Sequence, residues 1–335
     1  MAYHHHNAVV GVSKSQSVQL LERVFSSIKD APLLDALSGE VRRGPKGYPV
    51  KILWRCVLTR YVLGIPSTAA LIRTLQNSPA IAEVCGIHDI SEIPNPSTLS
   101  RFASRLAWEQ YRKHVKGISR ELVRRHYATL PGFGDRVALD STTLKAWANG
   151  RHGKRVDAEA GWSVKRGTQT KIEYTYGWKL HVLVDTETEM PISANVSRGN
   201  ENDHARAPRV LSEARFTYSK FYPKFLMADK GYAGRPLSRI IKQQYGASPI
   251  IDLPKNYASL QAEFGVKMAR PEWKALYAQR TAVERVFARL KGQHSLNHIR
   301  TRGLRRVTVH CYLSLIALQA KFVLPVADEF QLPLL

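Results

Sequence analysis

The sequence is short of cysteine and of long hydrophobic runs. Its three cysteines, Cys56, Cys85 and Cys311, lie far apart and form no C-x-x-C pair, so we expect reduced thiols and neither a disulfide framework nor a zinc site. The most apolar stretch, CYLSLIALQAKFVLP, is broken by Ser, Gln and Lys and predicts a buried helix rather than a membrane span. The start, MAYHHHNAVV, has no apolar leader, so no export is expected, and its three histidines are interpreted as part of a flexible terminus.

Acidic residues are also scarce. The 335 residues include 50 Lys and Arg against 27 Asp and Glu, which gives a net charge of +23. With 44% hydrophobic residues the chain has the composition of a globular protein that can bury a core. A charge of this size predicts a polyanionic partner, and nucleic acid is the first candidate. We expect no membrane partner, because the sequence shows no basic amphipathic anchor.

Residues 17–130 have the pattern of a helical region. Apolar residues recur at three- and four-residue spacing in SVQLLERVFSSI, VKILWRCVLTRYVLG, STAALIRTLQNSPAIAEVCG and the long run that starts at NPSTLSRFASRL. Both STAALIRTL and PSTLSRFASRL open with Ser or Thr in a capping position. Two such helices, the later one carrying Arg101 and Arg105, are typical of a helix-turn-helix DNA reader, but an ordinary bundle with solvated arginines fits the pattern equally well.

From residue 131 the pattern changes to a mixed α/β domain that we place at 131–322, between the helical region and a tail at 323–335; residues 1–16 form the flexible N-terminus. Strands are predicted at RVALD, EYTYGWKLHVLVD, MPISANVSRG, KFLMAD and SPIIDLP. After the strand MPISANVSRG, a mostly helical stretch is expected up to about residue 220. Further helices are expected at SRIIKQQYG, at 271–293 and at RRVTVHCYLSLIALQAKF. Residues 145–171 are polar, basic and rich in Gly, and we expect them to form one long loop.

Two acids stand where predicted apolar strands end. Asp140 follows VAL, and Asp229 follows FLMA. Strand ends are where ligands gather in α/β sheets, and a partly desolvated carboxylate there needs a cation or a raised pKa. A third acid from a nearby helix would complete an oxygen-only site of the kind that Mg²⁺ prefers, and two such ions can assist phosphodiester chemistry. Taken alone, each aspartate is more often a turn former or a helix cap.

The predicted helix at 271–293 offers the third acid. On one helical wheel, Tyr277, Arg280, Glu284 and Lys291 lie within a stripe about 60° wide, beside an apolar face. Arg280 and Glu284 could form a simple i, i+4 ion pair, but Lys291 lies too far along for that explanation. A carboxylate flanked by cations fits a helix that lies against a nucleic-acid backbone.

These motifs together resemble the bacterial insertion-sequence transposases of the DDE class. The spacing Y-x2-R-x3-E-x6-K from Tyr277 to Lys291 resembles the signature of that family, LDSTT around Asp140 resembles its first catalytic motif, and ADKGY around Asp229 resembles its second. SANVSRGNENDHARAP resembles the segment between them, and PSTLSRFASRL the N-terminal region. The likeness runs from about residue 40 to 320.

The resemblance implies a ribonuclease H-like fold and a chemistry. Asp140, Asp229 and Glu284 would be both the catalytic residues and the ligands of two Mg²⁺ ions, for which Mn²⁺ can substitute. The enzyme would bind the terminal inverted repeats of an insertion sequence, nick the DNA and join the freed 3′-OH to a target. No small-molecule cofactor is implied, and the interval between Asp229 and Glu284 is too short for the β-rich insertion that supports hairpin formation in some relatives.

Partners and DNA contacts follow from the same resemblance. It implies double-stranded DNA, both element ends and target, as the partner of a homodimer in the bacterial cytoplasm. The predicted DNA-binding residues are Tyr277, Arg280, Lys291, Arg300, Arg302, Arg305, Arg306, Arg101 and Arg105. Trp147 and Trp178 could stack on unpaired bases but are more often core residues. His181 and Asp185 are interpreted as structural.

Three other functions compete with this one. A DNA-binding protein derived from such an enzyme would keep the basic patches and be indifferent to Mg²⁺, although the intact acids disfavour it. Another metal-dependent nuclease of ribonuclease H-like fold would share the acids but not the full-length motif layout. A non-enzymatic RNA-binding protein would show a recognisable module, such as an aromatic-bearing RNP strand, and none is found.

Overall fold

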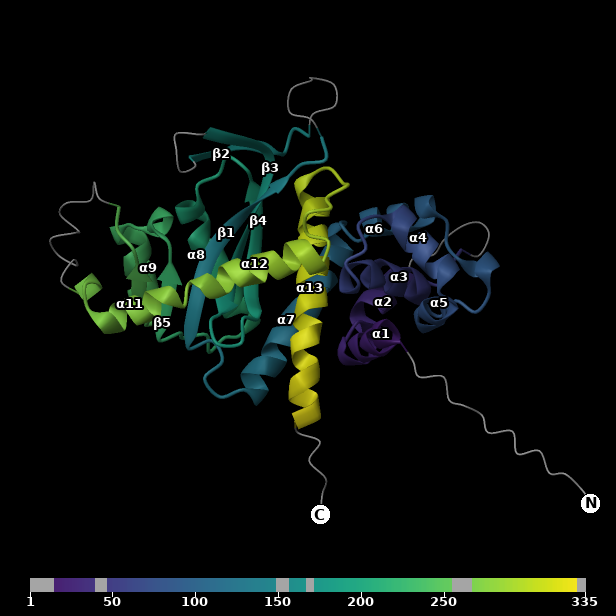
Figure 1. The fold of residues 1–335 in the computed structure, drawn as a ribbon, viewed down its shortest axis with the longest axis horizontal. Coiled ribbons are helices and arrows are strands. Elements are labelled where there is room, and N and C mark those ends of the chain that lie inside the picture. Colours follow the sequence, from purple (N-terminus) through teal and green to yellow (C-terminus); the bar gives the residue numbers. More distant parts are fainter. Residues whose placement is uncertain (1–14, 40–46, 149–156, 167–171, 255–266, 330–335) are drawn as a thin grey trace, which may run out of the picture.

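The computed structural model describes residues 15–39, 47–148, 157–166, 172–254 and 267–329. Side chains are described over the same ranges except at 165, 166 and 324–329. The three histidines at positions 4–6 and most of the predicted flexible N-terminus lie outside these ranges. Figure 1 shows a helical part and a sheet part on either side of one long helix, α13 (Leu304–Glu329).

The helical N-terminal region is confirmed. The α-helices in its described part are α1 (Gln16–Ser27), α2 (Ala31–Ser38), α3 (Val50–Val62), α4 (Thr68–Asn77), α5 (Pro79–Cys85), α6 (Pro96–Arg105) and α7 (Glu109–Thr129). Their apolar stripes meet in a core around Trp54, Leu58 and Leu71, each of which is buried. The N-cap of α4 is the predicted one, since Ala70 N donates to Ser67 Oγ at 3.1 Å.

The possible helix-turn-helix formed by α4 and α6 stays a prediction, although the connection between them and the cap of α6 differ from what the sequence indicated. α4 and α6 contact each other, but α5 and a short 3₁₀ turn lie between them in the chain, where that motif has a turn of only about three or four residues. The N-cap of α6 is Asn95 rather than a Ser or Thr: its Oδ1 accepts from Thr98 N at 2.9 Å, and Pro96 opens the first turn. Asparagine is an equally good cap, so the helix itself forms where predicted.

A six-stranded mixed sheet forms the second half of the molecule. The strands are β1 (Arg136–Lys145), β2 (Gly161–Arg166), β3 (Ile172–Asp185), β4 (Pro191–Arg198), β5 (Phe225–Ala228) and β6 (Ser248–Ile251). The order is β2-β3-β1-β5-β6, and β4 pairs with β3. β3 runs antiparallel to β1, β2 and β4, whereas β1, β5 and β6 are parallel. The predicted fold class is confirmed as a mixed α/β sheet flanked by helices after an N-terminal helical region.

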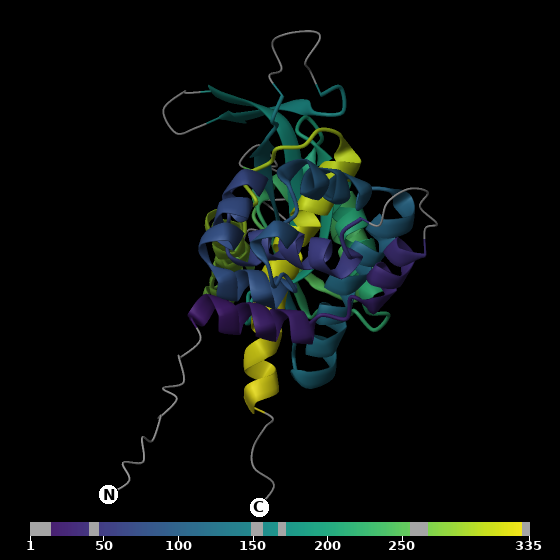
Figure 2. The ribbon, with the colours of Figure 1, turned by 90° about the vertical axis from the view of Figure 1, so that its right-hand side faces the viewer.

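Strand β2 corrects the expectation of one continuous loop at 145–171. It pairs with the first half of β3 as a hairpin that projects from the body of the protein, as Figure 2 shows. Gly177 permits the sheet to close at the base of this hairpin, because a Cβ atom there would lie 1.9 Å from Leu144 O. The pattern was missed because the apolar residues Trp162 and Val164 are exposed, whereas the buried positions that alternate with them hold the small residues Gly161 and Ser163.

Helices cover both faces of the sheet. They are α8 (Asp203–Thr217), α9 (Arg235–Tyr245), α11 (Pro271–Ala278), α12 (Thr281–Gln293) and the long α13. α12 crosses the near face in Figure 1 and contacts β1 and β3. The single helix predicted at 271–293 is two helices, which meet at Gln279 and Arg280.

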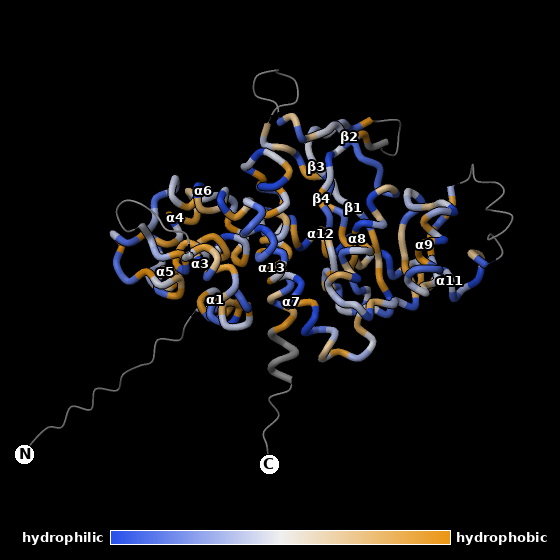
Figure 3. Tube along the Cα trace, turned by 180° about the vertical axis from the view of Figure 1, so that it is seen from behind, coloured by the Kyte–Doolittle hydropathy of each residue, from blue (hydrophilic) through white to orange (hydrophobic). Residues whose placement is uncertain are grey.

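One hydrophobic core joins the two halves of the molecule. α13 contacts α1, α3 and α7 as well as β4, and Figure 3 shows hydrophobic segments on both sides of it. Gly64, after α3, approaches α12 so closely that a Cβ would lie 2.6 Å from Gln293 O. α13 runs to Glu329, so the tail predicted from residue 323 is helical over its first half. The division at residue 130 stays a prediction, because α7 packs on both parts.

Candidate active site

Asp140 and Asp229 are neighbours on adjacent strands, although Asp140 lies in the middle of β1 rather than at its predicted end, and only Asp229 follows the last residue of its strand, β5. β1 and β5 are parallel neighbours, and Leu139 pairs with Ala228 in their register. Each aspartate is the next residue after that pair, so the two carboxylates leave adjacent strands at the same level. The parallel pairing of these two strands therefore joins motifs that are far apart in the sequence.

The electrostatics of Asp140 reflect this neighbourhood. Burial raises its pKa to about 6, and the nearby Asp229 and Asp203 carboxylates add to the rise. The amide of Ser141, 2.7 Å from Oδ1, and the Arg280 guanidinium act in the opposite direction. Burial and the neighbouring carboxylates thus outweigh the two contacts that lower the pKa, so a bound cation would stabilise the ionised form of Asp140.

Asp229 begins a tight turn that fixes its side chain. Its Oδ1 accepts from Gly231 N at 2.9 Å and caps the 3₁₀ turn Lys230–Tyr232. The buried Tyr232 lies next to the acids: burial raises its pKa first, and the carboxylates of Asp140, Asp203 and Asp229 raise it further. The predicted D-x-G-Y motif thus orients one carboxylate and packs a tyrosine beneath the site.

Arg280 connects the third acid to the first. Its Nη2 donates to Glu284 Oε1 at 2.7 Å, and its Nη1 lies 3.6 Å from Asp140 Oδ2. Glu284, in the first turn of α12, has a side chain that is 52% exposed, whereas those of Arg280 and Asp140 are only 18% and 20% exposed. The predicted i, i+4 ion pair therefore exists, and Arg280 also links Glu284 to Asp140.

The turn between β3 and β4 holds α12 in place. Glu189 in this turn has a positive φ of 60° and forms ion pairs with both Arg285 and Arg289 of α12. Thr186 Oγ1 donates to Gln279 Oε1 at 3.2 Å just before the helix. Asp185 accepts from Gly134 N and from Thr188, which is the structural role predicted for it. These contacts set the position from which Glu284 projects.

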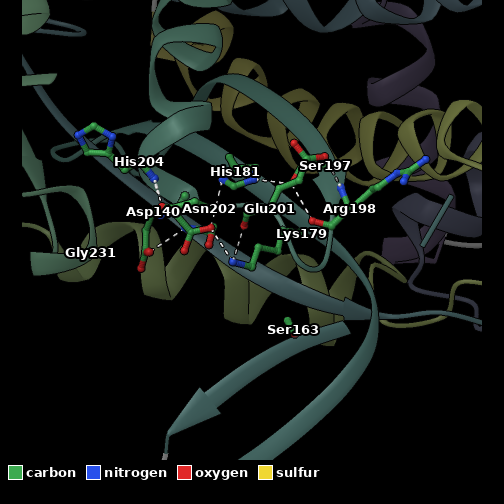
Figure 4. Close-up of polar contacts among 12 residues, drawn as sticks. Asp140, Ser163, Lys179, His181, Ser197, Arg198, Glu201, Asn202, His204 and Gly231 are labelled. Atoms are coloured by element: carbon green, nitrogen blue, oxygen red, sulfur yellow. Dashed lines mark hydrogen bonds and ion pairs between the residues drawn. The ribbon is translucent and has the colours of Figure 1, made fainter. Parts of the chain in front are cut away.

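A fourth acid, Asp203, stands near Asp140 and was missed in the sequence. Asp203 opens α8 and pairs with Lys179 Nζ at 2.9 Å, and His181 Nδ1 lies 3.8 Å from the same carboxylate oxygen. His181 is buried against Ser197, so burial lowers its pKa to about 4 and the ring is neutral. Figure 4 shows Asp140 beside this polar group. In the sequence, only the acidic turn GNENDH pointed to Asp203. Its place near Asp140 depends on the pairing of β3 with β1, which joins residues far apart in the chain.

The three acids have the donor chemistry of a divalent-cation site. All the ligand atoms would be carboxylate oxygens, which are the ligands that Mg²⁺ prefers. Within the described ranges, no three His, Cys, Asp or Glu side chains converge closely enough to hold one ion as they stand. The Arg280 guanidinium lies between two of the acids instead.

The predicted DNA-contact residues do not all reach the surface. Arg105 is only 7% exposed, its Nη2 donates to Leu37 O at 2.8 Å, and its guanidinium lies over the Tyr111 ring. This arginine joins α2, α6 and α7, so its assignment to DNA was wrong. Arg101, four residues earlier on α6, is exposed.

Aromatic side chains near the site divide into core and surface. Trp178 is fully buried and is therefore a core residue, the more frequent role of tryptophan. Trp147, in contrast, is 54% exposed. Arg300 lies over the Trp147 ring at 4.9 Å. Arg302, Arg305 and Arg306 are exposed around the start of α13. Lys291 is half-buried, and Tyr277 stacks on Trp273 at 5.0 Å.

The chain belongs to the DDE transposases. The family described as "Transposase DDE domain" matches residues 131–319, more than half of the sequence and including Asp140, Asp229 and Glu284. A second family, "Transposase domain (DUF772)", matches residues 12–105. Together they identify an insertion-sequence type of DNA transposase, as the motifs predicted.

Solved structures of transposases show a weaker likeness. A piggyBac transposase synaptic complex with hairpin DNA is 11% identical over 95% of this chain and 82% of that chain, with a TM-score of 0.45. A Mos1 transposase paired-end complex with the left transposon end is 12% identical over 79% and 82%, with a TM-score of 0.23. A pre-cleavage Mos1 transpososome is 15% identical over 88% and 84%, also with a TM-score of 0.23.

No curated protein matches the chain. Within the described ranges, none of the helices is both long enough and apolar enough to cross a membrane.

Proposed function

We propose that this transposase cuts and joins DNA at Asp140, Asp229 and Glu284. The three carboxylates would hold two Mg²⁺ ions, or Mn²⁺ in their place. Bound there, the ions would activate the attacking oxygen and stabilise the leaving oxygen of the phosphodiester. The observation that carries the proposal is the adjacency of Asp140 and Asp229 on parallel strands, with Arg280 linking Asp140 to Glu284.

The remaining residues of the site would position these acids and the DNA. Lys179 balances the charge of Asp203 next to Asp140, and Glu189 keeps α12 on the sheet. Lys291 and Tyr277 lie on either side of Glu284 in the chain and would contact phosphates or a displaced base. Arg280 would clamp a phosphate, because a guanidinium presents two parallel donors to an anion.

Double-stranded DNA is the partner that fits the charge. Arg300, Arg302, Arg305 and Arg306 form a basic cluster at the start of α13 that would follow the phosphate backbone. Arg300 and Trp147 together offer a cation and an exposed ring to an unpaired base. The helical region, 17–130, would bind the inverted repeats through exposed residues such as Arg101. Two element ends require two active sites, so we infer a homodimer on DNA.

The test is a nicking assay on linear DNA that carries the ends of the element. We expect 3′-OH release with Mg²⁺ or Mn²⁺, none with EDTA, and none from Glu284→Gln although it still binds DNA. Glu272→Gln removes an exposed acid from the preceding helix and should cleave like the wild type. Binding without cleavage under every metal condition would favour a DNA-binding protein that has lost its chemistry.

A further inference from the structure

We propose that Arg280 is a built-in competitor of the divalent cations, and that a DNA phosphate draws it away from the acids. The inference rests on the proposed function, since it takes Asp140 and Glu284 as metal ligands. It adds a regulation to that site: the free protein would bind metal weakly, and DNA would raise the affinity. Arg280 would thus be a positioning residue that links the two binding events.

The position of Arg280 carries the first step. Its two terminal nitrogens face two different acids, Asp140 Oδ2 at 3.6 Å and Glu284 Oε1 at 2.7 Å. Those oxygens are ligand atoms that a cation would need. A guanidinium and a metal ion at the same carboxylate oxygen repel each other, so binding of the ion weakens these ion pairs.

The setting of Arg280 makes the competition effective. Its side chain is 18% exposed, so water screens its ion pairs less than it would at the surface. Arg280 is the residue before α12, and its guanidinium also lies 5.8 Å from the Tyr277 ring centroid. The Tyr277 ring therefore gives the guanidinium a second contact that does not involve the acids.

DNA supplies the anion that shifts the balance. A phosphate accepts two parallel hydrogen bonds from a guanidinium, as a carboxylate does, so it can replace the acids as the partner of Arg280. Any ligand that withdraws Arg280 raises the affinity of the acids for metal. Because linkage is reciprocal, metal must raise the affinity for DNA by the same factor.

Binding of Mn²⁺ to the protein without DNA, followed by electron paramagnetic resonance, tests the competition. We expect Arg280→Gln to bind Mn²⁺ about tenfold more tightly than the wild type, since one charge-assisted ion pair no longer opposes the metal. Lys274→Gln removes an equal charge from an exposed position on the preceding helix, α11, so it should change the affinity by less than about threefold. The difference in bound Mn²⁺ between the wild type and Glu284→Gln gives the amount that is bound at the acids. Circular dichroism checks that each variant is folded.

The outcomes separate this inference from the proposed function. If Glu284→Gln loses Mn²⁺ but Arg280→Gln binds it no more tightly than the wild type, the competition is wrong and the metal site stands. If Glu284→Gln binds as much Mn²⁺ as the wild type, both fail. An equal gain in Lys274→Gln would also overturn the competition, because the loss of any positive charge would then explain the effect.

A second titration, with unrelated duplex DNA present, tests the role of phosphate. DNA should tighten Mn²⁺ binding to the wild type by a larger factor than to Arg280→Gln, with the ratio of the two factors about tenfold. The Mn²⁺ that the DNA itself binds is measured in a parallel titration with Glu284→Gln and is subtracted. Equal factors in the two proteins would show that phosphate does not act through Arg280.

Discussion

Single side chains set the position of the candidate site. Glu189 is the clearest case, because a non-glycine residue with a φ of 60° is held between Arg285 and Arg289. Its side chain is 20% exposed, while those of the arginines are 54% and 30% exposed, so solvent screens part of the attraction. The β3–β4 turn is thereby fastened to the helix that carries Glu284.

Glu189→Gln should therefore destabilise the protein by about 1 kcal/mol and lower nicking activity. The free energy of unfolding in urea measures the loss, which should shrink in high salt because the ion pairs are screened. Glu187→Gln, in the same turn, is the control and should leave stability unchanged. A salt-independent difference would show that the backbone conformation, not the ion pairs, is what Glu189 provides.

Trp147 is the side chain whose exposure most directly invites a test. Trp147→Ala should weaken binding of single-stranded DNA by about 1–3 kcal/mol, since a ring already covered on one side by Arg300 offers a stacking face. Fluorescence anisotropy of a labelled strand measures the affinity. Trp108→Ala removes another half-exposed tryptophan, in the helical region, and should have no effect. Equal losses from the two variants would contradict a specific role for Trp147.

Secondary-structure elements show where glycine is required and where it is not. Gly177 lies in β3, where a Cβ would meet Leu144 O at 1.9 Å, whereas a Cβ on Gly117, inside α7, would meet nothing within 4 Å. Both are single glycines within regular elements. Only the packing around them differs.

The two glycines should respond in opposite directions to replacement by alanine. Gly177→Ala should cost about 1–3 kcal/mol of unfolding free energy because strands β1 and β3 must separate. Gly117→Ala should gain about 0.5–1 kcal/mol, because alanine loses less backbone entropy in a helix. Thermal and urea unfolding give both values. Destabilisation by Gly117→Ala would mean that α7 has a neighbour that the packing does not show.

Elements also show how far the sequence could predict this structure. Strands β1, β3, β4 and β5 were recognisable because each contains a run of buried apolar residues, and Asp140 and Asp229 were found directly after such runs. β2 was missed because its apolar residues are exposed, and the break at Arg280 was missed because Gln279 and Arg280 keep helical angles. Asp203 and the burial of Arg105 depend on long-range packing, which a local pattern does not contain.

At the scale of the whole molecule, buried histidines make stability depend on pH. Burial lowers the pKa of His310 to about 3 and those of His294 and His181 to about 4. The unfolded chain, with histidine pKa values near 6.5, binds protons that the folded protein does not. Stability is therefore full above about pH 6.5 and falls as the pH drops toward the folded pKa values.

Urea unfolding between pH 7.5 and 5 should show this fall. Each buried histidine contributes a slope of up to about 1.4 kcal/mol per pH unit below its unfolded pKa. His310→Gln should be less stable at pH 7.5, since it loses contacts to Tyr61 and Leu296, but its stability should fall less steeply. His88→Gln, at an exposed position, is the control. A slope unchanged in His310→Gln would refute the assignment.

Helix α13 packs against α1, α3 and α7 on one side and against β4 on the other. The two halves of this transposase are therefore not interchangeable parts. A chimera that takes its first 130 residues from a relative would inherit a foreign partner surface for α13, and the mismatch would fall in the common core. Retargeting the enzyme to new element ends should accordingly begin with exposed residues of the helical region, or transplant α13 together with it.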